Sequence, residues 1–220
     1  MNQSITHVYF VPGLAAGKGI FKNIKLPESH YKMHILEWLI PNKSESLEEY
    51  AKRMANRVKE PQAILIGVSF GGIVVQEMSH FLNLQKVVLI SSVKTKHELP
   101  LRLKIAGKTK AYKLIPTKLI SKSEDFTKFA IGSKSKKRLA LYNEYLSVRN
   151  KEYLDWAIEQ MVCWKRDCAI NGIAHIHGSK DAVFPIKNIK DAIIVDGGTH
   201  VMLVYNAKTV TQELLNVFNN

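Results

Sequence analysis

The chain of 220 residues alternates short apolar runs with longer segments of mixed polarity. Six of the runs have the length and the apolar composition of strands, and the segments between them have room for helices. This alternation is typical of a mostly parallel sheet flanked by helices. We therefore predict an α/β fold with six strands, near residues 7–11, 34–38, 63–67, 86–91, 173–178 and 192–196.

Helices are predicted in the gaps between these strands. One covers about residues 46–59, one begins at Phe70, and the last covers about residues 207–218.

The fourth and fifth strands are separated by about eighty residues, far more than one crossover needs. This span must carry structure of its own, and we predict a helical cap over residues 94–170. The core of the domain would then comprise residues 1–93 and 171–220. Three signals favour helices in the cap: Pro100, which suits a first turn, and two sets at helical spacing, Leu139, Tyr142 and Leu146, and Leu154, Ile158 and Met161.

The formal net charge of +13 is concentrated in the same region. Between Lys94 and Lys151 there are 16 Lys and Arg residues against 4 acidic ones, whereas the rest of the chain holds 16 basic and 15 acidic residues. This basic block favours an anionic acyl group, a coenzyme A moiety or an acidic membrane surface as partner. A solvated basic helix face is the competing interpretation. Nucleic acid is not expected, because the lysines are not interleaved with aromatic platforms.

The chain shows no sign of a membrane span or of a disulfide framework. No apolar run approaches the roughly eighteen residues that a span needs, and the N-terminus lacks a signal-peptide pattern. The two cysteines, Cys163 and Cys168, have no second pair with which to form a zinc knuckle. We therefore expect a cytoplasmic protein with reduced, structural thiols.

A possible nucleophile stands where the third strand meets the next helix. The segment Gly67-Val68-Ser69-Phe70-Gly71 has the form G-x-S-x-G, which between a strand and a helix makes a nucleophile elbow. The tight turn exposes the serine hydroxyl, and glycines on either side let strand and helix approach closely. N–H groups at the start of the helix then face the same point and stabilise negative charge there.

A nucleophilic serine needs a base to take its proton and an acid to orient that base. Asp181 follows the fifth strand in HIHGSKDAVFP, and His200 follows the sixth in VDGGTHVMLV. Because parallel strands end at one edge of the sheet, we expect both to meet Ser69 there. Three other aspartates are less well placed for this role: Asp155, Asp167 and Asp196.

With these motifs the chain resembles the α/β-hydrolase superfamily over nearly its whole length except the cap. The resemblance implies that Ser69 is the nucleophile, His200 the general base and acid, and Asp181 the carboxylate that orients it. It also implies an oxyanion hole formed by the N–H groups of Phe70 and Leu14.

The resemblance further implies a strand order of 2-1-3-4-5-6, which would bring Leu14 beside Ser69. Two features depart from the family. Pro12-Gly13 stands where the family frequently has His-Gly, and the chain starts at the strand that leads to this loop. We therefore expect a version of the fold without the family's first two strands.

Two other chemistries are disfavoured by the sequence. GLAAGKG, at residues 13–19, differs from a phosphate-binding Walker loop in two ways. It has three residues instead of four between its first two glycines, and its lysine is followed by Gly19 instead of Ser or Thr. His175 and His177 share one face of the fifth strand, but strand histidines usually pack and hydrogen-bond, and no carboxylate cluster accompanies them. We expect no metal and no organic cofactor.

The sequence therefore predicts a serine hydrolase that cleaves a small-molecule ester or thioester through an acyl-serine intermediate. Two alternatives stay open. The same triad can transfer the acyl group to an alcohol or thiol or cleave a carbon–carbon bond, and the fold can serve as a catalytically silent, basic binding module. Neither the acyl chain length nor the oligomeric state follows from the sequence.

Overall fold

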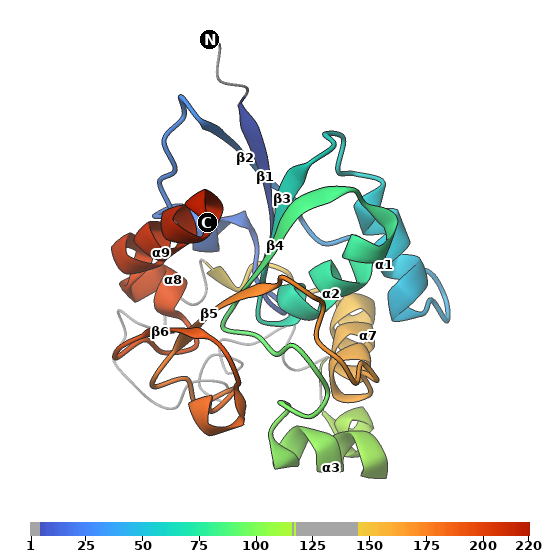
Figure 1. The fold of residues 1–220 in the computed structure, drawn as a ribbon. Helices are drawn as coiled ribbons and strands as arrows, with labels where there is room; N and C mark the ends of the chain where they lie inside the picture. The colour runs from blue at the N-terminus through green and yellow to red at the C-terminus, as the bar shows by residue number, and fades with distance from the viewer. Residues whose placement is uncertain (1–4, 116, 118–144) are drawn as a thin grey trace.

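The computed structural model describes residues 5–115, 117 and 145–220. In this part of the chain six strands form one sheet with the order β2-β1-β3-β4-β5-β6, and every neighbouring pair is parallel (Figure 1). The predicted fold class and strand order are therefore confirmed. The strands are β1 (Thr6–Val11), β2 (Tyr31–Ile35), β3 (Ala63–Val68), β4 (Leu84–Ile90), β5 (Ala174–Gly178) and β6 (Ile193–Val195).

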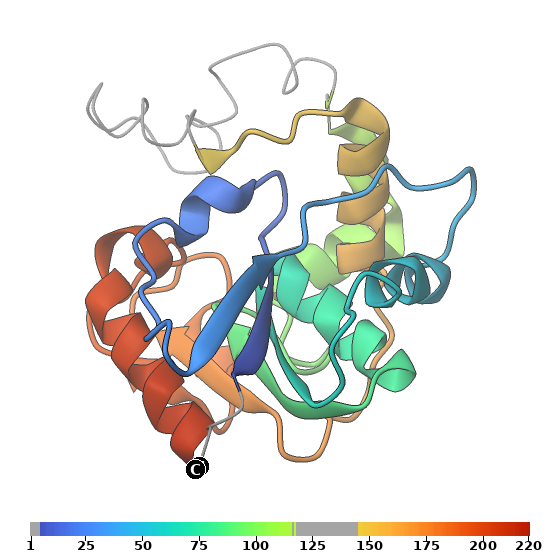
Figure 2. The same cartoon turned by 90° about the horizontal axis from the view of Figure 1, so that it is seen from above.

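Helices cover both faces of the sheet (Figure 2). Strand β1 has apolar side chains on both faces of the sheet: Tyr9 and Val11 pack into one apolar cluster, whereas Val8 and Phe10 pack into another. The first cluster lies under α1 (Leu47–Ala55), α2 (Phe70–Met78) and α7 (Lys151–Val162). The second lies under η1 (Lys18–Phe21), α8 (Met202–Tyr205) and α9 (Ala207–Asn219).

The remaining described helices are α3 (Leu101–Thr109), η2 (Ser79–Phe81), η3 (Ala111–Leu114) and η4 (Ile186–Asn188). None of the helices in the described ranges is long and apolar enough to cross a membrane.

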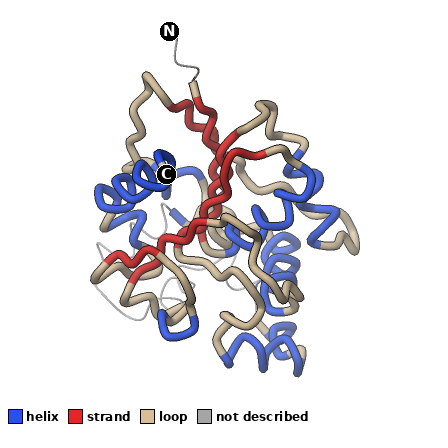
Figure 3. The backbone as a smooth tube through the Cα atoms, in the orientation of Figure 1, coloured by secondary structure: helices blue, strands red, loops and turns tan. Residues whose placement is uncertain are grey.

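The second strand was predicted three residues too late. It covers Tyr31–Ile35 rather than 34–38, because its register is set by pairing with β1, from Thr6 opposite Tyr31 onward. After this strand the Leu36 N–H still donates to the Phe10 carbonyl of β1, and further along the Leu39 N–H donates to the Tyr50 hydroxyl instead of to a strand. Figure 3 shows the loop that results between β2 and α1.

Helix α1 is shorter than predicted at its C-terminal end. It begins in a capping box, in which the Glu49 N–H donates to Ser46 Oγ and the Ser46 N–H donates to Glu49 Oε2. It ends at Ala55, after which Arg57 and Val58 form turns in place of the predicted helix to residue 59.

The predicted cap contains α3 and α7. Pro100 is the residue directly before α3, and α7 carries the predicted spacing of Leu154, Ile158 and Met161. Leu139 and Tyr142 lie outside the described residues, and Leu146 lies in irregular chain before α7. The division into a core and a cap stays a prediction.

Candidate active site

Ser69 occupies the turn between β3 and α2 in a strained backbone conformation, with φ 52° and ψ −119°. Such a conformation costs on the order of 1–3 kcal/mol in a residue with a side chain. Three bonds hold its backbone: the Ser69 N–H donates to the Ile90 carbonyl at 2.9 Å, and the Ser69 carbonyl accepts from Ser92 Oγ at 2.7 Å and from the Gly72 N–H at 2.9 Å. The local geometry is that of the predicted nucleophile elbow.

The glycines of the elbow are required by close backbone contacts. A Cβ atom on Gly67 would lie 2.4 Å from the Gly71 carbonyl oxygen. A Cβ atom on Gly71 would lie 2.3 Å from the Pro12 carbonyl oxygen. Only a residue without a side chain lets β3, α2 and the loop after β1 come this close.

The structure brings Ser69, His200 and Asp181 together at the carboxyl edge of the sheet. His200 Nδ1 lies 2.8 Å from Asp181 Oδ2, and His200 Nε2 lies 2.9 Å from Ser69 Oγ. A carboxylate only accepts, so Nδ1 carries the proton, and Nε2 is then free to accept the Ser69 hydroxyl proton. The imidazole therefore connects the hydroxyl to the carboxylate in one chain of hydrogen bonds.

Asp181 is held on both of its oxygens. Oδ2 faces His200, while Oδ1 accepts the N–H groups of Val183 at 2.8 Å and Phe184 at 2.9 Å. Burial alone would raise the pKa of Asp181, but the hydrogen bond and charge of His200, with the Phe184 N–H, bring this pKa below its usual value. The carboxyl therefore stays ionised opposite the imidazole.

The three alternative aspartates bind other groups. Asp155 pairs with Lys151, Asp167 with Lys96, and Asp196 accepts from Ser179 Oγ.

The two strand histidines, His175 and His177, bond to each other beside Asp181. His177 Nε2 donates to the Phe184 carbonyl at 2.9 Å, so its Nδ1 accepts from His175 Nε2 at 3.2 Å. Burial lowers the pKa of both imidazoles, which are therefore neutral. No group of three potential metal ligands occurs among the described residues.

The loop that follows β1 passes directly beside Ser69. A Cβ atom on Gly13 would lie 3.4 Å from Ser69 Cβ and 4.0 Å from Ser69 Oγ. Leu14 follows in this loop, and Phe70 is the first residue of α2. The two N–H groups named from the sequence thus belong to segments that adjoin Ser69.

Chain segments from the predicted cap also reach the site. The Gly17 N–H donates to the Tyr145 carbonyl, and the Val148 N–H donates to the Ala15 carbonyl, both at 3.0 Å. In Figure 2 the segment that leads into α7 passes over the loop between β1 and η1. The loop beside Ser69 is therefore tied to chain that lies 128 and 133 residues further along the sequence.

Arg102 was missed by the sequence analysis. Its guanidinium, on α3, donates to the carbonyls of Ala182 and Val183, both at 3.0 Å, directly after Asp181. Nothing in the sequence marks this contact, because Arg102 is one of many basic residues in its segment and its acceptors are backbone oxygens.

No protein-family model and no curated protein sequence matches the chain. Solved structures do resemble it. An esterase from Thermogutta terrifontis matches 99% of this chain and 91% of its own, with a TM-score of 0.69 at 13% identity. An epoxide hydrolase from Bacillus megaterium matches 100% and 95%, with a TM-score of 0.71 at 11% identity.

A third structure is described as an α/β-hydrolase fold protein from Burkholderia ambifaria. It matches 97% of this chain and 91% of its own, with a TM-score of 0.68 at 12% identity. The parallel sheet in the order 2-1-3-4-5-6, the elbow after β3 and these structural neighbours together show that the chain has the α/β-hydrolase fold.

Proposed function

We propose that the protein is a serine hydrolase that cleaves a carboxylic ester or thioester. The observation that carries this proposal is the position of the His200 imidazole between Ser69 Oγ, at 2.9 Å, and Asp181 Oδ2, at 2.8 Å. This is the arrangement that nucleophilic catalysis needs, with a nucleophile in contact with a base and the base oriented by a third group.

In the proposed reaction Ser69 Oγ attacks the substrate carbonyl carbon while its proton moves to His200 Nε2. The electron pair of the carbonyl bond moves to the oxygen, and the tetrahedral intermediate collapses as the leaving oxygen or sulfur takes the proton from His200. Water then attacks the acyl-serine with His200 as base, and the free acid leaves. Asp181 stays ionised throughout and stabilises the imidazolium.

The N–H groups of Leu14 and Phe70 are the proposed oxyanion donors. Leu14 follows Gly13, which packs against Ser69, and Phe70 follows Ser69 directly in the chain. Loss of one such donor typically lowers kcat by about 10²- to 10³-fold.

The basic block supports an anionic acyl group as the preferred substrate. Five basic residues and no acidic ones lie in 101–115, the part of the proposed cap that contains α3 and η3. Because Arg102 of this part contacts the chain directly after Asp181, the charge lies close enough to the site to steer an anion. A solvated face without a role in substrate binding is the alternative.

The first experiment is intact-mass labelling with a fluorophosphonate probe, which reacts only with an activated serine. We expect one adduct on the native protein and none on Ser69→Ala or His200→Ala. Ser29→Ala, which changes an exposed serine outside the site, is the matched control and should label fully. A folded native protein without an adduct would overturn the proposal and favour a binding module.

Hydrolysis and acyl transfer are separated by product analysis. With an ester and a competing alcohol or thiol in the same reaction, a hydrolase releases only the free acid. Transfer products at the expense of the acid would instead assign the same triad to an acyltransferase.

A further inference from the structure

The proposed donor at Leu14 shares a peptide group with the Gly13 carbonyl. A trans peptide is planar, and its C=O and N–H point in opposite directions. Whatever holds the Gly13 oxygen therefore also sets the direction of the Leu14 N–H.

Two donors hold the Gly13 oxygen. The Ala16 N–H reaches it at 3.0 Å and closes a tight turn, in which Ala15 has a positive φ of 60°. Trp38 Nε1 reaches the same oxygen at 3.1 Å from the loop between β2 and α1. The turn bond is local to the loop, whereas the bond from Trp38 ties the peptide to the rest of the domain.

The indole of Trp38 is itself fixed by aromatic contacts. Its ring lies 5.5 Å from the ring of Phe70 and 5.3 Å from the ring of Tyr153. Phe70 belongs to the elbow, and Tyr153 belongs to α7. The indole thus joins the elbow, the loop beside it and a helix of the predicted cap.

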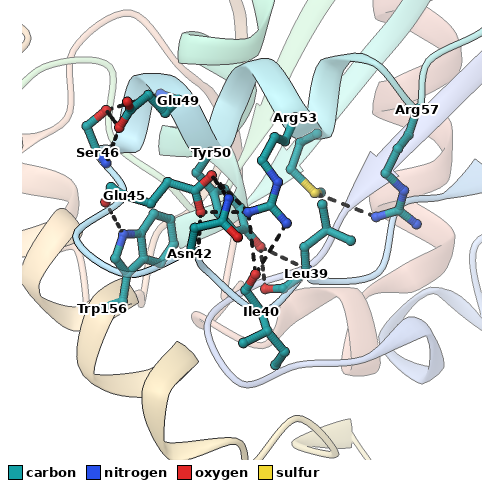
Figure 4. Close-up of polar contacts among 11 residues, drawn as sticks. Leu39, Ile40, Asn42, Glu45, Ser46, Glu49, Tyr50, Arg53, Arg57 and Trp156 are labelled. Carbon is teal, nitrogen blue, oxygen red and sulfur yellow. Dashed lines mark hydrogen bonds and ion pairs between the residues drawn. The ribbon is translucent and has the colours of Figure 1, made fainter.

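The loop between β2 and α1, which carries this indole, is held by hydrogen bonds to α1 and α7 (Figure 4). The Tyr50 hydroxyl accepts from the Leu39 N–H and donates to the Leu39 carbonyl, both at 2.9 Å. Nearby, Arg53 pairs with the buried Glu45 carboxylate at 2.7 Å. Trp156 Nε1 donates to the Glu45 carbonyl at 2.7 Å, which connects the same loop to α7.

We propose that Trp38 is a positioning residue for the reaction: its indole N–H holds the Gly13 carbonyl so that the Leu14 N–H points to the oxyanion. This inference rests on the proposed function and deepens it. Trp38 touches no reacting atom, and it acts by setting the orientation of one peptide group before the charge develops.

The test is Trp38→Phe, which keeps an aromatic ring against Phe70 and Tyr153 but removes the N–H. We expect kcat for an ester substrate to fall about 5- to 20-fold while KM changes less than about 2-fold, because only the transition state is affected. A trifluoromethyl ketone adds to the serine and forms a tetrahedral oxyanion, so its affinity should fall by the same factor. The affinity for the product acid, which forms no such oxyanion, should stay constant.

A second variant keeps the shape of the side chain. Replacing Trp38 by benzothienylalanine puts a sulfur atom in place of the indole N–H, and it should reproduce the loss in kcat with little change in Tm. Trp164→Phe is the matched control, since it also removes a buried indole N–H bond, here the one of 2.8 Å to Glu77 Oε1, without touching the Gly13 peptide or the loop of Trp38. We expect it to lower Tm and leave kcat unchanged.

Three outcomes would count against the proposal. Full activity in both Trp38 variants overturns it, and a loss of kcat in Trp164→Phe that equals the loss in Trp38→Phe would assign the effect to a general loss of stability. A wild-type protein that is neither labelled nor active overturns the proposed function, and this inference with it.

Discussion

Ser92 Oγ donates a hydrogen bond of 2.7 Å to the Ser69 carbonyl, and the same side chain fills the space in front of Gly72. A Cβ atom on Gly72 would lie 2.2 Å from Ser92 Oγ and 2.5 Å from Ser92 Cβ. The strained backbone of Ser69 is thus held by a small side chain that fits only against a glycine.

This arrangement predicts different behaviour for two neighbouring glycines. Gly71→Ala places a methyl group against the carbonyl oxygens of Pro12 and Val11, at 2.3 and 2.5 Å, so backbone must move, and we expect a loss of about 1–3 kcal/mol or more in the free energy of unfolding. Gly72→Ala meets a side chain, so the added change Ser92→Gly should restore part of the loss. Urea unfolding measures both.

The control is Ser92→Gly in the Gly71→Ala background, where no recovery is expected. A Gly71→Ala protein as stable as the wild type would contradict the close approach of α2 to the loop after β1.

Much of this fold is predictable because its strands carry strong local signals. Strand β3 is buried at every position and reads as one apolar run, which places it within a residue. Strand β2, with the sequence YKMHI, has no such run, and its start at Tyr31 is decided by pairing with Thr6 of β1. That pairing is a property of the sheet, so the sequence pattern misplaces the strand.

The residues of the candidate site also divide into those that the sequence predicts and those that it does not. Ser69, Asp181 and His200 are predictable because each follows a strand in a recognisable order of residue types. Trp38 and Arg102 are not, because their acceptors are backbone carbonyls 25 and at least 80 residues away. A carbonyl is present at every residue and carries no signal of its own.

Asp181→Asn should lower kcat by about 10³- to 10⁴-fold, since an amide at this position no longer selects the tautomer in which His200 Nε2 accepts the serine proton. Ester turnover and the rate of fluorophosphonate labelling both measure the effect. Asp196→Asn and Asp167→Asn are matched controls, because these carboxylates bond to Ser179 and Lys96 rather than to His200. A large loss of activity in either control would reassign the acid.

Arg102→Gln should lower kcat/KM about 2- to 10-fold. The guanidinium donates two bonds, both of 3.0 Å, to the carbonyls of Ala182 and Val183, directly after Asp181. The shorter glutamine side chain cannot make both bonds, so the loop that carries the Asp181 carboxylate is held less firmly. Steady-state kinetics on a neutral ester measures the loss without a contribution from substrate charge. Lys108→Gln, on the same helix, removes one charge and should keep full activity on that ester, so equal losses in both variants would contradict a specific contact.

The stability of the protein should fall in acid because of His175. Burial, followed by the neighbouring His177, lowers the pKa of His175 to about 3, whereas an unfolded histidine has a pKa of about 6.5. Between these values the unfolded chain binds a proton that the folded chain does not. The free energy of unfolding should therefore decrease as pH falls through this window, by up to about 1 kcal/mol per pH unit.

Urea unfolding from pH 7 to pH 4 measures this slope. His175→Gln does not titrate and should flatten the slope, whereas Ile73→Val, which weakens the core without a titrating group, should lower stability equally at each pH. An unchanged slope in His175→Gln would show that other groups carry the acid sensitivity.

The basic block predicts a substrate-dependent response to salt. If it steers anions, kcat/KM for an anionic ester should fall several-fold between about 0.01 and 0.5 M salt, because the Debye length shrinks from about 30 Å to a few ångströms, while a neutral ester of the same acyl length changes little. The double change Lys108→Glu and Lys113→Glu should reduce the salt response of the anionic ester. Lys25→Glu with Lys43→Glu, two exposed lysines outside the block, should leave most of it in place. Equal salt responses for the two esters would identify the block as a solvated face without a role in substrate capture.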